Sequence, residues 1–139
     1  MTNLITKLSE AQKLAMSIRP KVGGFPTLAE VLREAGVIEN RWFLPSCQAI
    51  YQMKEGSVVQ QGTPLVTGVH EIPKFHRENV IKAIREDQEG KSTFPEFLKA
   101  AWEAGVVGYD VDFTNRKVIY YGVNGESYWE EYPAVTLEG

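Results

Sequence analysis

The chain has 139 residues, a single cysteine and a formal net charge of −3 at pH 7. This length suits one domain that buries its own core, and 43% apolar with 24% charged residues is ordinary for a soluble globular protein. The acidic balance excludes a general nucleic-acid binder, which needs a surplus of Lys and Arg. One cysteine, Cys47, excludes an internal disulfide, and no apolar run is long enough to span a bilayer. We therefore expect a cytoplasmic protein.

The first half is predicted to begin with two helices. Apolar residues recur at helical spacing over residues 3–18. In the next helix, Pro26 suits the first turn, and Thr27 with Glu30 matches a capping box. Gly36 can adopt the left-handed conformation that closes this helix. Strand-like segments follow at 42–44, 48–53 and 57–60, whereas Leu65–Val69 is either a further strand or a crossing between halves.

The second half is predicted to repeat this order. A helix over residues 76–89 precedes a second helix, for which Thr93 and Glu96 form a capping box. Asn124-Gly125 favours a two-residue type I′ turn. This turn would join the last two strands of a three-stranded meander, predicted at 109–113, 117–123 and 126–132.

The two halves also resemble each other in sequence at an offset of 69 residues. Nine of the 32 positions from Phe25 to Gly56 are identical to their counterparts from Phe94 to Gly125, where about two are expected by chance. The matches continue beyond the helix into the strands. We predict an α+β fold with an internal duplication: a single domain over residues 1–139, built of two α-α-β-β(-β) halves at about 1–62 and 70–133.

The run AGVVGYDVDF, from Ala104 to Phe113, and the following Tyr120-Tyr121-Gly122 resemble the YbcV-like family of small bacterial and prophage-associated proteins. The resemblance implies an α+β fold with helices packed on antiparallel strands. The family has no established activity, so the resemblance implies no functional residue.

Side-chain alternation predicts the two faces of the meander. If Asn124-Gly125 is a two-residue turn, Tyr121 lies opposite Tyr128 and Tyr120 lies opposite Trp129. The predicted core face carries Tyr109, Val111, Phe113, Val118, Tyr120 and Trp129. The predicted outer face carries Asp110, Asp112, Lys117, Ile119, Tyr121, Glu126, Tyr128, Glu130 and Tyr132. The offset of 69 extends the outer face to Arg41, Phe43, Gln48, Ile50, Gln52, Val59 and Gln61.

Such an outer face is either an ordinary solvated sheet surface or a contact surface. Tyrosine combines a large contact area with a polar tip, and grouped carboxylates suit a cationic ligand or a basic protein partner. The candidate binding residues are Asp110, Asp112, Tyr121, Tyr128, Glu130 and Tyr132. We expect no metal, because two aspartates supply too few oxygen ligands, and no cofactor. The predicted function is a binding or protein-interaction module, which could self-associate.

The alternative is a small enzyme whose acid–base chemistry lies in a cleft between the halves, using Asp110, Asp112 or His76. The spacing of His70, Glu71 and His76 does not match the zinc motif that places two histidines on one helical face. Cys47 is expected to be a buried, inert thiol.

Overall fold

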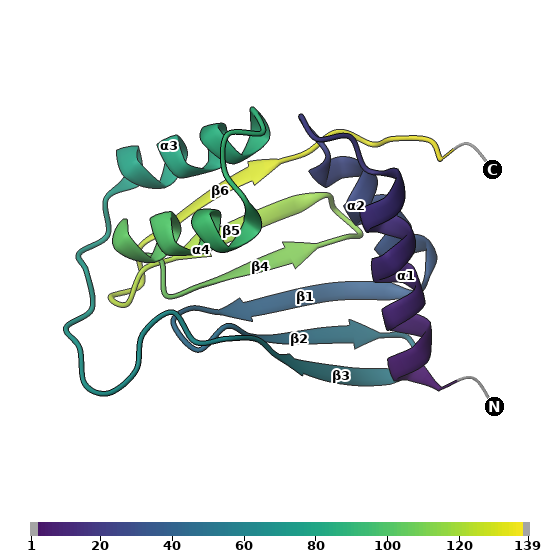
Figure 1. The fold of residues 1–139 in the computed structure, drawn as a ribbon, viewed down its shortest axis with the longest axis horizontal. Coiled ribbons are helices and arrows are strands. Elements are labelled where there is room, and N and C mark those ends of the chain that lie inside the picture. The colour runs from purple at the N-terminus through teal and green to yellow at the C-terminus, as the bar shows by residue number, and fades with distance from the viewer. Residues whose placement is uncertain (1–2, 138–139) are drawn as a thin grey trace.

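The computed structural model describes residues 3–137 and repeats one order of elements, ααβββ, twice along the chain (Figure 1). The fold class predicted from the sequence is therefore confirmed. The first set comprises α1 (Leu4–Ile18), α2 (Phe25–Glu34), β1 (Val37–Phe43), β2 (Gln48–Met53) and β3 (Gly56–Gln61). The second set comprises α3 (Arg77–Gln88), α4 (Phe94–Glu103), β4 (Gly108–Asp112), β5 (Lys117–Tyr121) and β6 (Ser127–Glu131).

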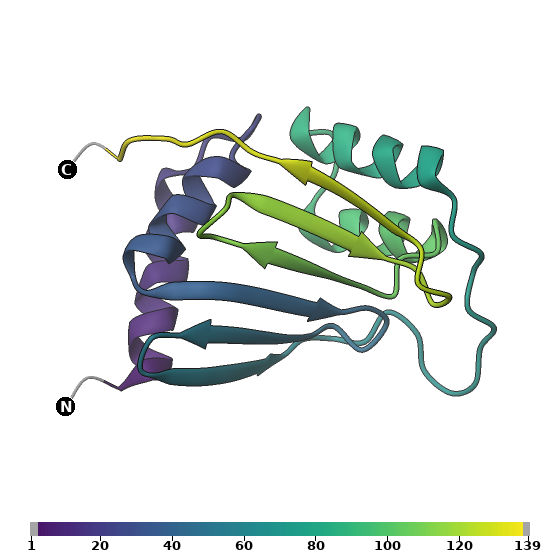
Figure 2. The ribbon, with the colours of Figure 1, turned by 180° about the vertical axis from the view of Figure 1, so that it is seen from behind.

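All six strands form one antiparallel sheet in the order β3-β2-β1-β4-β5-β6. The two sets join where β1 pairs with β4, with Arg41 directly opposite Asp110. α3 and α4 lie on one side of the sheet, behind the strands in Figure 2, and α1 crosses one end of the sheet on the same side, next to α2 (Figures 1 and 2). One face of the sheet is thus covered by helices, and the other has no helix over it in residues 3–137.

The N-termini of the helices confirm one predicted capping box and contradict the other. Asn3 caps α1 through its side chain, and Thr93 with Glu96 forms the predicted capping box of α4. The capping box predicted for Thr27 and Glu30 is wrong, because α2 already begins at Phe25 after Gly24 and has no side-chain cap. Thr27 therefore lies inside the first turn. The buried Glu30 side chain instead binds Arg33 at 2.9 and 2.5 Å.

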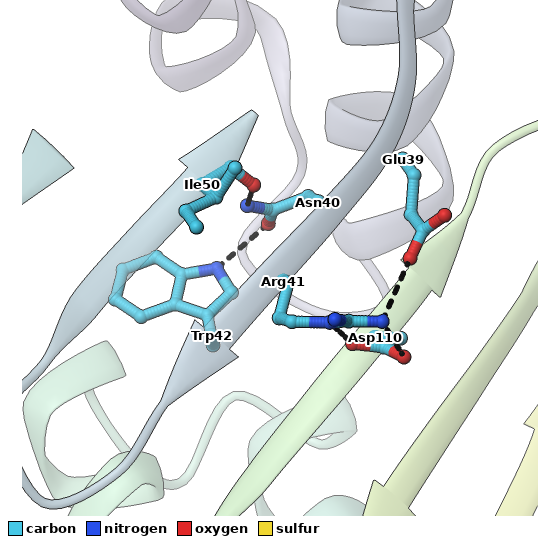
Figure 3. Close-up of polar contacts among 6 residues, drawn as sticks. All are labelled: Glu39, Asn40, Arg41, Trp42, Ile50 and Asp110. Atoms are coloured by element: carbon cyan, nitrogen blue, oxygen red, sulfur yellow. Dashed lines mark hydrogen bonds and ion pairs between the residues drawn. The ribbon is translucent and has the colours of Figure 1, made fainter. Parts of the chain in front are cut away.

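The core lies between the helices and the covered face of the sheet. Of the residues predicted for the core face of the second half, Tyr109, Val111, Phe113, Val118 and Tyr120 are buried. The covered face of the first half includes Asn40, a buried polar residue whose amide both donates and accepts a hydrogen bond. It donates to the Ile50 carbonyl at 3.1 Å and accepts from the Trp42 indole at 2.7 Å (Figure 3).

Residues 62–76 cross from β3 to α3, so Leu65–Val69 is a crossing and not an additional strand. This crossing passes directly against the end of α4, where the His76 N–H donates to the Ala104 carbonyl at 2.8 Å. Gly105 follows with a φ of +94°, as Gly36 does after α2 with a φ of +102°. Both glycines close their helices in the left-handed conformation, as predicted for Gly36.

The register of the last hairpin differs from the prediction by one residue. Tyr120 lies opposite Tyr128 and Ile119 lies opposite Trp129. The cause is the turn, which has three residues, because Gly122 N–H donates to the Glu126 carbonyl at 2.8 Å. Gly125 has a φ of +87°, as in three-residue hairpin loops that contain a left-handed residue.

This shift reverses both faces of β6, because side chains alternate along a strand. The predictions that Tyr128 and Glu130 lie on the outer face, and that Trp129 lies in the core, are therefore wrong. Trp129 is 50% exposed on the face without helices, whereas Tyr128 and Glu130 point to the helix side.

Candidate functional site: the open face of the sheet

The open face is the sheet surface that carries no helix, and the strand registers place three residues of each strand on it. The first half contributes the predicted set together with Glu39 and Ser57. In strand order these residues are Ser57, Val59 and Gln61; Gln48, Ile50 and Gln52; Glu39, Arg41 and Phe43. The second half contributes Gly108, Asp110 and Asp112; Lys117, Ile119 and Tyr121; Ser127, Trp129 and Glu131.

An ion pair occupies the centre of this face. Arg41 donates to both carboxylate oxygens of Asp110, at 2.8 Å from Nε and 3.2 Å from Nη2 (Figure 3). Glu39 lies 3.5 Å from the same guanidinium. The hydrogen bond with Asp110 raises the pKa of Arg41 further above its ordinary value. Because Arg41 and Asp110 are 69 residues apart, equivalent positions of the two halves face each other with opposite charges.

A shallow groove of about 330 Å³ lies beside this ion pair, where the two halves meet. Gly108 forms part of its lining, and the rings of Phe43 on β1 and Tyr121 on β5 flank it. Neighbouring strands are about 4.8 Å apart, so these two side chains rise about 10 Å apart on either side of the glycine. A Cβ at position 108 would come within 2.8 Å of the Trp42 carbonyl oxygen. β1 can approach this closely only because residue 108 is a glycine. The missing side chain also leaves the space between Phe43 and Tyr121 that forms the groove.

Tyr121 is the one predicted binding tyrosine that the structure places on the open face. Its side chain is half-buried. Burial raises the pKa of the Tyr121 phenol, and the nearby Asp110 carboxylate raises this pKa further. The phenol thus stays protonated and can donate a hydrogen bond at the rim of the groove.

Asp112 lies on the open face but serves the adjacent turn. Its carboxylate accepts from the Thr114 and Asn115 N–H groups, both at 3.0 Å, and from the Asn115 amide at 2.8 Å. Burial pushes the pKa of Asp112 upward, but these hydrogen bonds outweigh burial and leave the pKa below its ordinary value. Asp112 therefore supplies negative charge, while its oxygens are committed to the chain itself.

Tyr128 and Glu130 instead attach β6 to α3 on the covered side. Arg85 donates to the two Glu130 oxygens at 3.0 and 2.6 Å, and the Tyr128 hydroxyl donates to the same carboxylate. The Arg77 guanidinium lies over the Tyr128 ring, 5.1 Å from its centre. These contacts give Tyr128 and Glu130 a role in packing.

Tyr132 follows β6 and packs against the first half of the chain. Its ring meets the ring of Phe25 edge-to-face at 5.1 Å. Burial raises the pKa of Tyr132 to about 12. The candidate binding set is therefore divided by the structure: Asp110, Asp112 and Tyr121 share the open face, whereas Tyr128, Glu130 and Tyr132 do not.

Trp129 is the largest of the open-face residues that sequence reasoning missed, which also include Glu39, Ser57, Gly108, Ser127 and Glu131. The ammonium of Lys117 lies over its indole, 4.1 Å from the ring centre. Its position follows from the turn length alone, so the available signal was the ambiguity between a two-residue and a three-residue loop at Asn124-Gly125.

The other residues considered for chemistry, His70, His76 and Cys47, do not form a second polar site. His70 lies in the crossing and contacts the Thr67 carbonyl at 2.6 Å, whereas His76 precedes α3. Among residues 3–137, no three His, Cys, Asp or Glu side chains are grouped as a metal would require. Cys47 is buried, and burial raises the pKa of its thiol. Over the same residues, no helix has the length and apolar character needed to cross a membrane.

Comparison with known proteins supports the expected relationship only at its broadest level. The model of the DUF1398 family, described as a protein of unknown function, matches residues 14–132. The uncharacterized proteins Rv2012 of Mycobacterium tuberculosis (strain H37Rv) and Mb2035 of Mycobacterium bovis are each 48% identical over 139 residues. The alignments cover 100% of this chain and 85% of each relative. These matches give no support to the YbcV name or to a prophage association. The chain belongs to the DUF1398 family of proteins of unknown function.

Proposed function

We propose that the protein is a non-enzymatic binding module that holds a segment of a partner protein on its open face. The observation that carries this proposal is the groove at Gly108, between Phe43 and Tyr121 and beside the Arg41–Asp110 pair. An aromatic side chain of the partner enters this groove. There it meets two rings and the flat guanidinium of Arg41, which Asp110 holds in place and which favours stacking.

The charges around the groove favour basic residues next to that aromatic anchor. The open face carries four carboxylates, from Glu39, Asp110, Asp112 and Glu131, but only two cations. Both cations are engaged, Arg41 with Asp110 and Lys117 with the Trp129 ring. A rim with surplus negative charge around an aromatic centre matches the usual anatomy of protein interfaces, in which rim charges select the partner. We also propose a cytoplasmic location, because the chain has a single cysteine and no apolar run long enough to span a bilayer.

The enzyme alternative has less support. Both oxygens of Asp110 already accept hydrogen bonds from Arg41, and those of Asp112 accept from the following turn. His76 is not among the residues that line the groove.

Three blocked tripeptides test the proposal: Lys-Trp-Lys, Lys-Ala-Lys and Glu-Trp-Glu. We expect Lys-Trp-Lys to shift the NMR amide signals of Phe43, Gly108 and Tyr121 at the lowest concentration. Lys-Ala-Lys lacks the anchor and Glu-Trp-Glu opposes the rim charge, so both should bind more weakly. Equal responses to all three peptides, or shifts confined to another surface, would contradict the proposal.

Two tyrosine variants supply the matched pair for this titration. Tyr121→Ala should abolish the response to Lys-Trp-Lys, because it removes one wall of the groove. Tyr128→Ala should keep the response, because the register places this side chain on the covered face. The amide spectrum of each variant without peptide checks that the fold is retained. A loss of binding in Tyr128→Ala alone would overturn the assignment.

A further inference from the structure

The outer edge of β3 is the least protected part of the sheet. Five of its six residues are exposed, and Val59 is 61% exposed. Among residues 3–137 no strand pairs with this edge, and Figures 1 and 2 show no element beyond it. Its sequence, GSVVQQ, contains no charge and no proline, which are the usual means of blocking an exposed edge.

The hydrogen-bond pattern shows which main-chain groups point outward from β3. Gly62 N–H donates to the Cys47 carbonyl at 2.8 Å, which continues the β2–β3 register by one pair. Hydrogen-bonded pairs alternate along an antiparallel ladder, so Gln60 and Val58 also direct their main-chain groups at β2. It follows that the N–H and C=O groups of Ser57, Val59 and Gln61 face away from the sheet.

The outward N–H and C=O groups of β3 can bond with the same groups of a second copy of the strand. If two copies of β3 pair in antiparallel fashion about a twofold axis at Val59, Val59 bonds with its own counterpart and Ser57 bonds with Gln61 of the second copy. Each pair exchanges two hydrogen bonds. The side chains across the junction are Val with Val, Ser with Gln and Val with Gln, so no charge is buried or opposed.

The opposite edge of the sheet is unsuited to the same contact. The β5–β6 register directs the main-chain groups of Ser127, Trp129 and Glu131 outward. Pairing two copies there would bring Glu130 and Glu131 of both chains into one seam, and Pro133 follows directly. Adjacent carboxylates and a nearby proline are edge-blocking features. The β3 edge is therefore open to pairing with another strand, whereas the β6 edge carries features that oppose it.

We infer that the protein self-associates into a twofold dimer through β3, which joins two six-stranded sheets into one continuous antiparallel sheet. A contact made by one short strand is smaller than the roughly 1,200 Å² typical of stable complexes, so the dimer is reversible and depends on concentration. The inference does not rest on the proposed function, because the groove at Gly108 lies three strands away from β3.

Sedimentation velocity over a wide range of protein concentration tests this inference. The parent should pass from monomer to dimer, and Val59→Lys should raise the dissociation constant by about tenfold or more, because it places two ammonium groups opposite each other at the axis. Val59→Thr and Trp129→Lys, the latter on the opposite edge, should dimerise like the parent. Circular dichroism checks that each variant is folded, which is expected because both positions are exposed.

A mixed isotope-labelled sample gives the decisive geometry. The proposed register predicts an intermolecular contact between the Hα atoms of Val58 in one copy and Gln60 in the other, since these residues form the close, non-hydrogen-bonded pair. A monomer at every concentration, a dimer that survives Val59→Lys, an open-ended series of larger species, or intermolecular contacts at β6 would each overturn the inference. Tyr121→Ala should leave the dimer intact while it removes peptide binding.

Discussion

Glu130 is the residue that connects β6 to α3 through charge. Its carboxylate is mostly buried and accepts hydrogen bonds from Arg85 and Tyr128. The Arg85 guanidinium lowers the pKa of Glu130, although burial acts in the opposite direction. Because the folded pKa lies below the unfolded one, the unfolded chain binds this proton more readily. The stabilisation is complete above the ordinary glutamate pKa of about 4.3 and is lost as pH falls through the lower folded pKa.

We predict that Glu130→Gln reduces the free energy of unfolding at neutral pH by about 1–2 kcal/mol, since it weakens a charge-assisted contact. Part of the loss of stability between neutral and acidic pH should disappear in the same variant. Urea unfolding at several pH values measures both effects. Glu131→Gln is the control, because Glu131 is the next residue along β6 and its carboxylate is exposed on the open face. Equal losses in the two variants would contradict the assigned role of Glu130.

At the scale of elements, α2 and α4 begin with the same Phe-Pro pair but are stabilised differently. The Thr93 side chain accepts from the Glu96 N–H at 3.3 Å, and the Glu96 carboxylate accepts from the Thr93 N–H at 2.8 Å. Gly24 precedes α2 and offers no side chain for such a bond, while Thr27 stands within the helix. Thr93 precedes its Phe-Pro pair and caps α4, whereas Thr27 follows its Phe-Pro pair and lies inside α2.

Thr93→Ala should lower the free energy of unfolding by about 1 kcal/mol, because it leaves the Glu96 N–H at the helix start without its side-chain acceptor. Thr27→Ala should change it by less than about 0.5 kcal/mol, as is usual for positions outside such features. Chemical denaturation of both variants makes the comparison. If Thr27→Ala lowered the free energy of unfolding more than Thr93→Ala, Thr27 would have to cap α2, which contradicts the absence of a side-chain cap at Gly24.

At the scale of the whole molecule, the two halves differ where the crossing passes against the second one. A Cβ on Gly36 would approach only the Lys7 ammonium, at 3.6 Å. A Cβ on Gly105, the equivalent position, would lie 2.4–2.5 Å from main-chain atoms of Phe75 and Lys74. Gly105 thus both ends α4 and admits the segment that connects the halves.

Gly36→Ala should cost about 1 kcal/mol, from left-handed backbone strain alone. Gly105→Ala should cost at least about 3 kcal/mol, because the crossing must also move away from α4. Thermal unfolding with calorimetric detection measures both values. If the two variants lost equal stability, the contact between the crossing and α4 would not contribute to the fold.

The sequence by itself determined the features that depend on neighbouring residues. Helical periodicity, the Thr93 capping box, Gly36 as a helix end and the alternation of 109–113 and 117–121 were predicted because each signal spans only a few positions. The offset of 69 residues also predicted two similar halves, and it correctly placed Arg41, Phe43, Gln48, Ile50 and Gln52 on the open face. Local patterns could not decide that β1 begins at Val37, since its early residues are not uniformly apolar.

Tertiary structure alone decided which side chains of β6 lie on the open face, and which two strands form the edges of the sheet. Asn124-Gly125 is compatible with both loop lengths, and one residue of difference moves Tyr128 and Glu130 from the open face to α3. Likewise, no sequence pattern states that Arg41 meets Asp110, because that contact requires β1 and β4 to be neighbours at the centre of the sheet. Strand order arises from long-range pairing of the backbone, which a local pattern does not encode.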